Sequence, residues 1–208
     1  KKATNIFRKI SKKIVYCSLK EAEFSKLFSN AFRYAQFAIS NEFYMLADKA
    51  NLDFNKIRKI TKDGYPRAES MPSAGFAAGP CLLKDTMQLL SFSRNNFSMG
   101  NSSMLVNEGL VLYLIDKLES KYNLKSKNVG LLGISFKADC DDTRSSLSYK
   151  MKKFLSTKVN KLFSTDPFVK TDKNLSTLEK TIKNSDILIV CVPHKEYKNL
   201  DLRNKKVV

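Results

Sequence analysis

The N-terminal half of the chain places its apolar residues three or four positions apart. Residues 21–50 (EAEFSKLFSNAFRYAQFAISNEFYMLADKA) contain no Gly or Pro and keep this spacing, which predicts one long amphipathic helix of roughly 45 Å. Asp53 is placed to cap a shorter helix that runs to Lys62, and Asp-Gly-Tyr-Pro at residues 63–66 then ends the helical pattern. The pattern therefore predicts a first region built of helices.

A loop of about residues 63–80 interrupts the helices and holds three of the five prolines and three of the seven glycines. A loop of this length inside a compact domain is usually functional or disordered. It leads into Cys81, after which the sequence reads as a helix start. Residues 102–122 predict a further helix, and its inward-facing residues are expected to be Leu105, Leu112, Ile115 and Leu118.

From Asn128 onward, short apolar runs alternate with helical segments. VGLLGISF, VNKLF, ILIVCV and the terminal KKVV read as strands, and residues 145–156 and 176–184 read as helices between them. Such alternation is typical of parallel βαβ units with both faces of the sheet covered. We therefore expect a helical domain over residues 21–124 and a parallel-sheet α/β domain over residues 125–208.

The charge of the chain favours anionic partners without choosing among them. Thirty-seven Lys and Arg against 20 Asp and Glu give a net charge of +17, which suits nucleic acid, an acidic membrane or a phosphorylated small molecule. The basic residues are spread along the chain, which lowers the expectation of nucleic-acid binding. No apolar run approaches the roughly 20 residues of a membrane span, and the basic N-terminus lacks the features of a secretory signal, so we expect a cytoplasmic protein.

Cys81 is the first candidate for chemistry. It follows a Gly-Pro turn and lies at or just before a helix N-terminus, where free amides and the helix dipole favour a thiolate. The alternative is a buried small hydrophobic residue. The four cysteines form no CxxC pair, and the single histidine, His194, is expected to be incidental, so we expect no metal site.

A polar row on the first long helix is the second candidate. Lys26 and Asn30 stand four residues apart, so both side chains project from one helix face, and Arg33 continues the row. A rigid helix of this kind can direct an ammonium group and an amide at one point. An ordinary solvated polar stripe is the alternative explanation.

A glycine turn after the first strand of the α/β region is the third candidate. Gly130 and Gly133 lie where a parallel sheet binds ligands, and the loop that follows carries Lys137 and Arg144, which could hold a pyrophosphate. The turn has only two of the three glycines of a GxGxxG motif. Simple strand-to-helix packing with surface charges is the alternative.

Together these segments resemble the UDP-glucose/GDP-mannose dehydrogenase family, whose members oxidise the C6 alcohol of a nucleotide sugar to a carboxylate. EAEFSKLFSN is similar to the family's helix with a catalytic Lys and Asn, GFAAGPCLLKDTMQL to its nucleophile loop, and GLLGISFKADCDDTRSS to its nucleotide-sugar-binding turn. The resemblance covers the chain from about residue 22 to its end. It implies a helical central domain that mediates dimerisation, followed by a Rossmann-like parallel-sheet α/β domain.

The resemblance implies roles for the matching residues. Those implied in catalysis are Cys81, Lys26, Asn30 and Asp85. Those implied in substrate binding are Arg67, Phe76, Gly79 and Lys137, and those implied in binding the cofactor NAD are Lys84 and Arg144. Cys81 would capture the aldehyde as a thiohemiacetal that becomes a thioester, and Arg67 resembles the arginine that a neighbouring subunit lends to the sugar site.

The resemblance also implies partners. Residues 1–20 resemble the end of an N-terminal NAD-binding domain, and the chain is expected to stop within its C-terminal domain and to form a homodimer through the long helix. The expected substrate is a UDP-sugar of polysaccharide biosynthesis, with UDP-glucose preferred and a UDP-N-acetylhexosamine or GDP-mannose as the alternative, because Ala77, Ala78 and Pro80 depart from the family's usual stretch. A nucleotide-binding module without catalysis and a basic nucleic-acid binder are the other classes left open.

Overall fold

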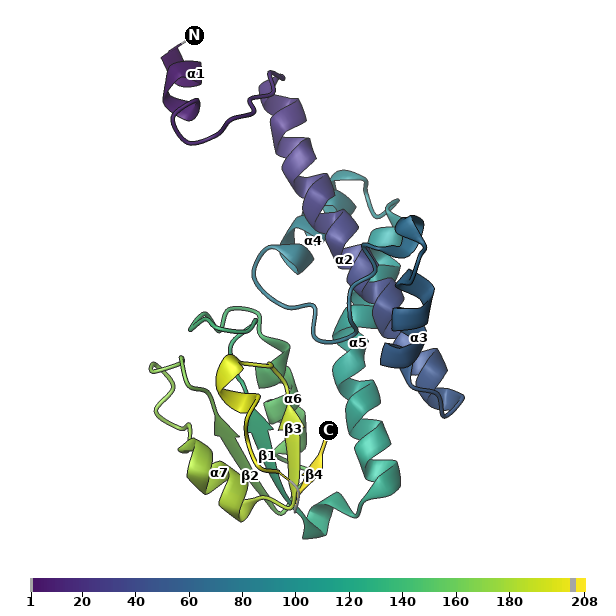
Figure 1. The fold of residues 1–208 in the computed structure, drawn as a ribbon, viewed down its shortest axis with the longest axis vertical. Coiled ribbons are helices and arrows are strands. Elements are labelled where there is room, and N and C mark those ends of the chain that lie inside the picture. Colours follow the sequence, from purple (N-terminus) through teal and green to yellow (C-terminus); the bar gives the residue numbers. More distant parts are fainter. Residues whose placement is uncertain (1, 203–204) are drawn as a thin grey trace.

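The computed structural model describes residues 2–202 and 205–208. Its first region is helical and its second alternates strands and helices (Figure 1). The elements of the first region are α1 Lys2–Phe7, α2 Leu19–Lys49, α3 Phe54–Lys62, η1 Pro66–Ala68, α4 Leu82–Phe92, α5 Ser98–Lys121 and η2 Leu124–Ser126. Within the described part of the chain, no helix is both long and apolar enough to cross a lipid bilayer.

The long helix α2 begins where its sequence supplies a capping box. Ser18 Oγ accepts a hydrogen bond from the backbone N–H of Glu21 (3.3 Å), and the Glu21 carboxylate accepts one from the N–H of Ser18 (2.7 Å). These contacts satisfy amides that the first turn of a helix leaves free. From there α2 packs against α4 and α5, which confirms the predicted long helix.

The buried face of α5 differs from the face that its leucines predict. Ile115 and Leu118 are buried as expected, but Leu105 and Leu112 are 69% and 44% exposed. That part of the prediction is wrong. The inward face of α5 includes Asn107, which is fully buried, and a hydrophobicity pattern does not register a polar residue as part of a core.

Asn107 is accommodated because both the nitrogen and the oxygen of its side-chain amide are hydrogen-bonded. Its Nδ2 donates to the backbone oxygen of Tyr34 (3.0 Å), and its Oδ1 accepts from Asn41 Nδ2 (2.9 Å). Both partners belong to α2, so the buried amides join the two long helices. Buried polar groups are tolerated when they are hydrogen-bonded in this way.

The second region is a parallel sheet with the strand order β2-β1-β3-β4. Its elements are β1 Asn128–Leu132, α6 Leu147–Leu155, β2 Lys161–Thr165, α7 Leu178–Asn184, β3 Ile187–Val190, η3 Lys195–Tyr197 and β4 Lys206–Val207. The pairs β1–β2, β1–β3 and β3–β4 are all parallel. This confirms the predicted fold class, a helical region followed by a parallel-sheet α/β region.

Different helices cover the two faces of the sheet, because successive side chains of a strand point to opposite sides. Val129 of β1 lies in a core formed with α5 and α6, whereas Leu132 lies in a core that includes residues of α7. Gly130 faces α7, where an added Cβ would come within 2.9 Å of Thr181 Cγ2. The missing side chain therefore lets α7 approach the sheet.

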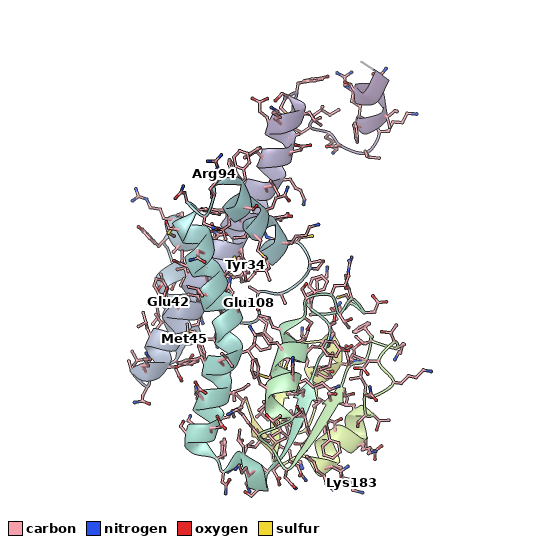
Figure 2. The ribbon with its side chains drawn as sticks, turned by 180° about the vertical axis from the view of Figure 1, so that it is seen from behind. Tyr34, Glu42, Met45, Arg94, Glu108 and Lys183 are labelled. Carbon is pink, nitrogen blue, oxygen red and sulfur yellow. The ribbon has the colours of Figure 1, made fainter. Side chains whose placement is uncertain are left out.

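Helix α5 connects the two regions by packing against both α2 and α6 (Figure 1). Lys150 on α6 donates from Nζ to the backbone oxygen and to Oε2 of Glu108 on α5, at 2.9 Å in each case. Figure 2 shows Glu108 partway along α5, where that helix passes the α/β region. The junction thus combines apolar packing with a half-buried ion pair.

Candidate active site at the junction of the two regions

Cys81 occupies the N-cap of α4, as the sequence predicts. Its side chain makes no capping hydrogen bond, and the residue is exposed. The first amides of α4 and the helix dipole therefore favour negative charge beside the thiol. Its exposure argues against the alternative of a buried hydrophobic residue.

Asp85, in the first turn of α4, joins this helix to α2. Its side chain is 3% exposed, and its Oδ2 accepts hydrogen bonds from Lys26 Nζ (2.8 Å) and from Asn30 Nδ2 (2.5 Å). Burial disfavours the charged carboxylate, but these two hydrogen bonds outweigh it and lower the pKa of Asp85. The hydrogen bond between Lys26 and Asp85 also raises the pKa of Lys26, so these two side chains form an ion pair at neutral pH. Two residues of the predicted polar row, Lys26 and Asn30, therefore converge on one buried carboxylate, whereas Arg33 does not contact it.

Two cations lie within electrostatic range of Cys81. One is the ammonium group of Lys26, whose side chain is 63% exposed and so reaches open space beside α4. The other is the guanidinium of Arg144, from the loop between β1 and α6. Positive charge beside a cysteine favours its thiolate form.

A crevice of about 400 Å³ opens in front of Cys81, between the helical region and the α/β region. Asn30 contributes to its lining together with three cations and three aromatic residues, which are Arg33, Lys137, Arg144, Phe37, Phe76 and Phe136. Asp142 is the carboxylate in this lining. The crevice is therefore positively charged and suits an anionic ligand.

Gly79 brings the loop before α4 against the α/β region. Its backbone N–H donates to the oxygen of Ser145 (3.4 Å). Its φ is +106°, and an added Cβ would lie 2.7 Å from the ring of Phe136. Only glycine tolerates both this backbone conformation and this close approach. The segment that resembles the family's nucleophile loop is therefore in contact here with the segment that resembles its nucleotide-sugar-binding turn.

A second hollow, of about 340 Å³, continues the crevice along the α/β region. It shares Phe37, Phe76, Phe136 and Lys137 with the first hollow and reaches the carboxyl ends of β1 and β3 and the N-terminus of α6. Parallel sheets bind ligands at this edge. The two hollows form one cleft with the thiol at one end and the sheet edge at the other.

The cations of the β1–α6 loop are held in different ways. Lys137 Nζ lies 5.5 Å from the centroid of the Phe136 ring. The Asp142 carboxylate accepts hydrogen bonds from Arg144 Nε (3.1 Å) and Nη2 (2.7 Å). Arg144 is therefore oriented before any ligand arrives, whereas Lys137 has only the ring beneath it.

Four of the residues assigned by resemblance do not line the cleft: Lys26 and Asp85, which pair with each other, and Lys84 and Arg67. Lys84 is exposed in the first turn of α4, beside Asp85. Arg67 lines a separate, largely apolar groove of about 610 Å³ between α2, α3 and η1. All other residues assigned to catalysis or binding meet at the cleft or at Asp85.

The sequence analysis assigned no role to two residues of this region, Phe37 and His194. Phe37 lines both hollows, and its position seven residues after Asn30 on the same helix could have revealed it. His194 is buried behind the crevice: it is 1% exposed and contacts Asp166 and Ser135. No local pattern distinguishes a buried histidine of this kind.

Two family models match the chain. Residues 20–108 match the central domain of the UDP-glucose/GDP-mannose dehydrogenase family, and residues 130–208 match its UDP binding domain. Between them they cover every residue of the cleft named above. The match therefore rests on the same two segments whose contact forms the cleft.

Individual proteins show the same similarity. A UDP-N-acetyl-D-mannosamine dehydrogenase of Pyrococcus horikoshii is 27% identical over 96% of this chain and 50% of its own length. A solved structure of that enzyme from the same organism has a TM-score of 0.85 at 25% identity, covering 97% of this chain and 49% of the other. A UDP-glucose dehydrogenase structure from Pyrobaculum islandicum shares the fold, with a TM-score of 0.81 at 24% identity, covering 90% of this chain and 47% of the other.

The chain spans about half the length of the curated relatives it matches. The matched half includes the cysteine of the crevice, the carboxylate beneath it and the cationic loop of the α/β region. By both family models, the chain belongs to the UDP-glucose/GDP-mannose dehydrogenase family.

Proposed function

We propose that this chain carries the substrate-oxidising site of an NAD-dependent dehydrogenase that converts the C6 hydroxyl of a UDP-sugar to a carboxylate. The observation that carries the proposal is the convergence of Lys26 and Asn30 on Asp85, one turn from the exposed Cys81. The cleft beside this group is long and positively charged. It suits a sugar at the thiol and a nucleotide toward the sheet.

The chemistry follows from the positions of these side chains. Once C6 is at the aldehyde level, the Cys81 thiolate attacks that carbon and forms a thiohemiacetal. Lys26 stabilises the negative oxygen, because its ammonium interacts electrostatically with Cys81 and is kept charged by Asp85. Once the thiohemiacetal has been oxidised to a thioester, water attacks the same carbon, the thiolate leaves, and the carboxylate is released. Asp85 and Asn30 keep Lys26 in place throughout.

NAD would supply the acceptor for both hydrides. The residues that would hold it from this chain are Lys84 and Arg144, which are exposed near Cys81. Their cationic groups fit the diphosphate of a dinucleotide, and Asp142 already orients Arg144. The sequence contains no GxGxxG turn, so the remaining NAD contacts are expected from residues outside this chain.

The sugar we propose is a UDP-N-acetylhexosamine. The sequence favours UDP-glucose, but its alternative agrees with relatives named UDP-N-acetyl-D-mannosamine dehydrogenase, at 27% and 28% identity. Specificity constants for UDP-N-acetylmannosamine and UDP-glucose would decide between them. A higher value for UDP-glucose would overturn this choice of sugar.

Protection of the thiol tests the site directly on this chain. UDP should slow alkylation of Cys81 but not of Cys17, which is also exposed and lies outside the cleft. In a protein that includes the NAD-binding part, Cys81→Ser should abolish carboxylate formation, and Cys17→Ser should leave it unchanged. Unchanged turnover of the Cys81→Ser protein would refute the nucleophile, while UDP binding without any oxidation would favour a non-catalytic nucleotide-binding module.

The proposed assembly is a homodimer along α2. Ile39, Phe43 and Leu46 are 44%, 47% and 58% exposed on this helix and line the groove that contains Arg67. A second copy packed there would bury apolar surface and bring each groove against a partner. A monomeric mass in solution would contradict this assembly, and Leu46→Glu should produce that mass if the proposal holds.

A further inference from the structure

His194 lies directly behind the cleft without touching it. It follows β3 and is 1% exposed, and it lines neither hollow of the cleft. The rings of Phe168 and Tyr197 enclose it, with centroids at 5.1 Å and 5.4 Å. A side chain in this position can affect a ligand only through the residues that it holds.

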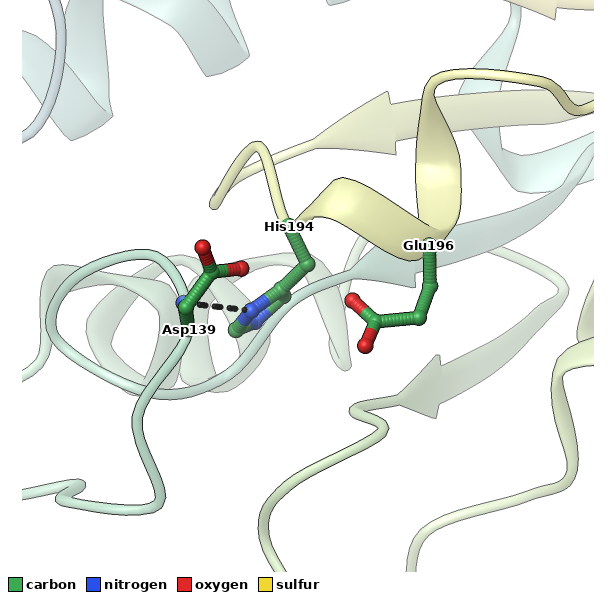
Figure 3. A group of neighbouring side chains, drawn as sticks. All are labelled: Asp139, His194 and Glu196. Atoms are coloured by element: carbon green, nitrogen blue, oxygen red, sulfur yellow. Dashed lines mark hydrogen bonds between the residues drawn. The ribbon is translucent and has the colours of Figure 1, made fainter.

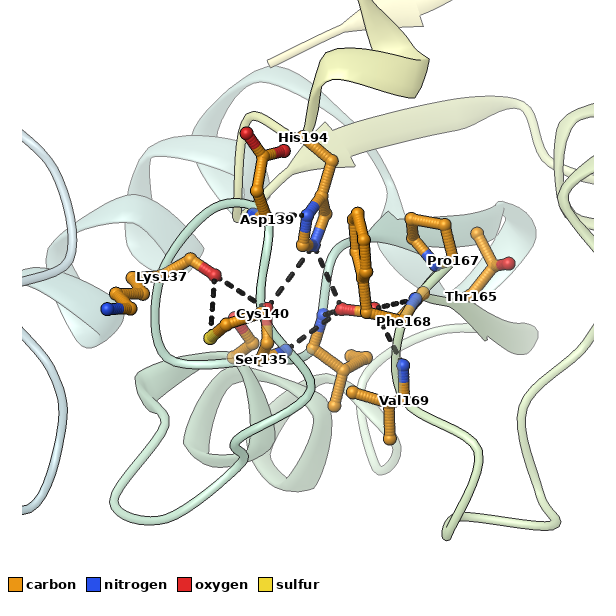
Figure 4. Close-up of polar contacts among 12 residues, drawn as sticks. Ser135, Lys137, Asp139, Cys140, Thr165, Pro167, Phe168, Val169 and His194 are labelled. Carbon is orange, nitrogen blue, oxygen red and sulfur yellow. Dashed lines mark hydrogen bonds and ion pairs between the residues drawn. The ribbon is translucent and has the colours of Figure 1, made fainter.

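The contacts of the ring define its protonation (Figure 4). Nδ1 accepts a hydrogen bond from the backbone N–H of Asp139 (3.0 Å) and therefore carries a lone pair. The ring proton then lies on Nε2, which is 3.0 Å from Asp166 Oδ2 and 3.3 Å from Ser135 Oγ. This is a neutral imidazole in a single tautomer.

The same contacts argue against a cation at this place. Ligand atoms of Asp139, His194 and Glu196 lie within 4.8 Å of one another (Figure 3). However, the Nδ1 lone pair is already used by the Asp139 amide, and the Asp139 carboxylate pairs with Lys195 Nζ (3.0 Å). A metal at Nδ1 would have to break both interactions, and a metal at Nε2 would have to displace Asp166, so the cluster is better explained by its hydrogen bonds.

The imidazole holds the binding loop on both sides of Lys137. On one side, Ser135 is next to Nε2, and its hydroxyl donates to the backbone oxygen of Lys137 (2.8 Å). On the other side, the Asp139 amide is bonded to Nδ1. Between these anchors the loop presents Phe136 and Lys137, which line both hollows of the cleft.

The geometry points to His194 as a positioning residue: in its neutral Nε2–H form it fixes residues 135–139 and thereby places Phe136 and Lys137 for the nucleotide sugar. This inference rests on the proposed function of the cleft. It separates His194 from the catalytic residues, because the imidazole reaches the ligand only through the loop.

Nitrogen NMR on the 208-residue chain tests the tautomer without any ligand. The sequence contains one histidine, so selective ¹⁵N labelling yields one imidazole. We expect a pyridine-type signal for Nδ1 and a pyrrole-type signal for Nε2 at neutral pH. Two protonated nitrogens, or a proton on Nδ1, would overturn the inference.

Three substitutions separate the two contacts of the ring. His194→Phe keeps an aromatic ring but removes both hydrogen bonds; His194→Asn keeps an acceptor near Nδ1, and His194→Gln keeps a donor near Nε2. With UDP as the probe, His194→Phe should weaken binding about tenfold, which is the equivalent of one to two hydrogen bonds. His194→Asn and His194→Gln should each recover part of this loss.

A purely structural role would leave a different signature. Folded variants would then lose thermal stability but bind UDP with wild-type affinity, and this result would overturn the inference. Amide shifts of Lys137 and Asp139 in the ligand-free chain give an independent measure. If the wild-type chain does not bind UDP, the proposed function fails, while unchanged shifts in His194→Phe would refute the positioning role.

Discussion

Two buried carboxylates organise the two regions of the molecule in opposite ways. Asp85 is held by the side chains of Lys26 and Asn30, and the Lys26 side chain is 63% exposed. Asp166 is held by four backbone amides and by His194, and the side chains of Asp166 and His194 are both fully buried. One carboxylate is paired with an exposed cation, and the other has only buried or backbone partners.

The difference shows that the two carboxylates have different tasks. The Asp166 carboxylate accepts hydrogen bonds from backbone amides that follow β1 and β2, and so it fixes the ends of these strands relative to each other. Because its oxygens are occupied by these amides, it is not free to interact with a ligand. A carboxylate satisfied by an exposed ammonium group keeps that cation charged, and the cation interacts electrostatically with Cys81. Burial alone therefore does not distinguish the two carboxylates; the nature of their hydrogen-bond partners does.

The largest expected effect comes from Asp166→Ala. It would leave buried amides and the imidazole of His194 without their acceptor, so we expect the free energy of unfolding to fall by about 3–5 kcal/mol. Urea denaturation measures this. Asp116→Ala on the exposed side of α5 should change stability by less than about 0.5 kcal/mol.

A smaller effect is expected for Asp85→Ala, about 1–3 kcal/mol in the same experiment. Lys26 can return to water when its acceptor is removed, because its side chain is already largely exposed. A loss as large as that of Asp166→Ala would show that the two carboxylates are equivalent and would break the comparison.

Acid should destabilise the protein through both carboxylates. The pKa values of Asp85 and Asp166 lie below the ordinary 3.8 in the folded state, so the unfolded chain takes up protons first. Their contribution is complete above about pH 5 and is lost as the pH falls through the folded values, by up to about 1.4 kcal/mol per pH unit for each proton. Unfolding free energies measured from pH 6 to pH 2.5 should fall less steeply for Asp166→Asn than for the wild type.

The smallest effect on stability is expected for Lys26→Met. The substitution removes one of the two hydrogen bonds to the buried Asp85 carboxylate and leaves that of Asn30, so the free energy of unfolding should fall by only about 0.5–1.5 kcal/mol, and Lys20→Met on the same helix is the neutral control. Carboxylate formation by the NAD-binding form of the protein should nevertheless fall by about 100-fold or more. A strongly destabilised but fully active Lys26→Met protein would reverse the roles given to the two carboxylates.

The main features of the cleft could be predicted from particular residues. The four-residue spacing of Lys26 and Asn30 placed them on one face of α2, and the Gly-Pro turn placed Cys81 at a helix start. The exposure of Leu105 could not be predicted, because the buried face of α5 includes Asn107, whose amide is satisfied by α2. The domain boundary near residue 125 and the catalytic and binding roles of all the site residues stay predictions.

By itself, the sequence determined the elements and their chemistry. Helical and strand periods are local properties of the chain, and so are a capping box such as that of Ser18 or a cysteine before a helix. Only the tertiary structure decided that Asp85 receives both Lys26 and Asn30, that Gly79 meets Phe136, and that His194 is buried. The physical reason is that these contacts join segments far apart in sequence, and their energies depend on burial and on partners that no local pattern contains.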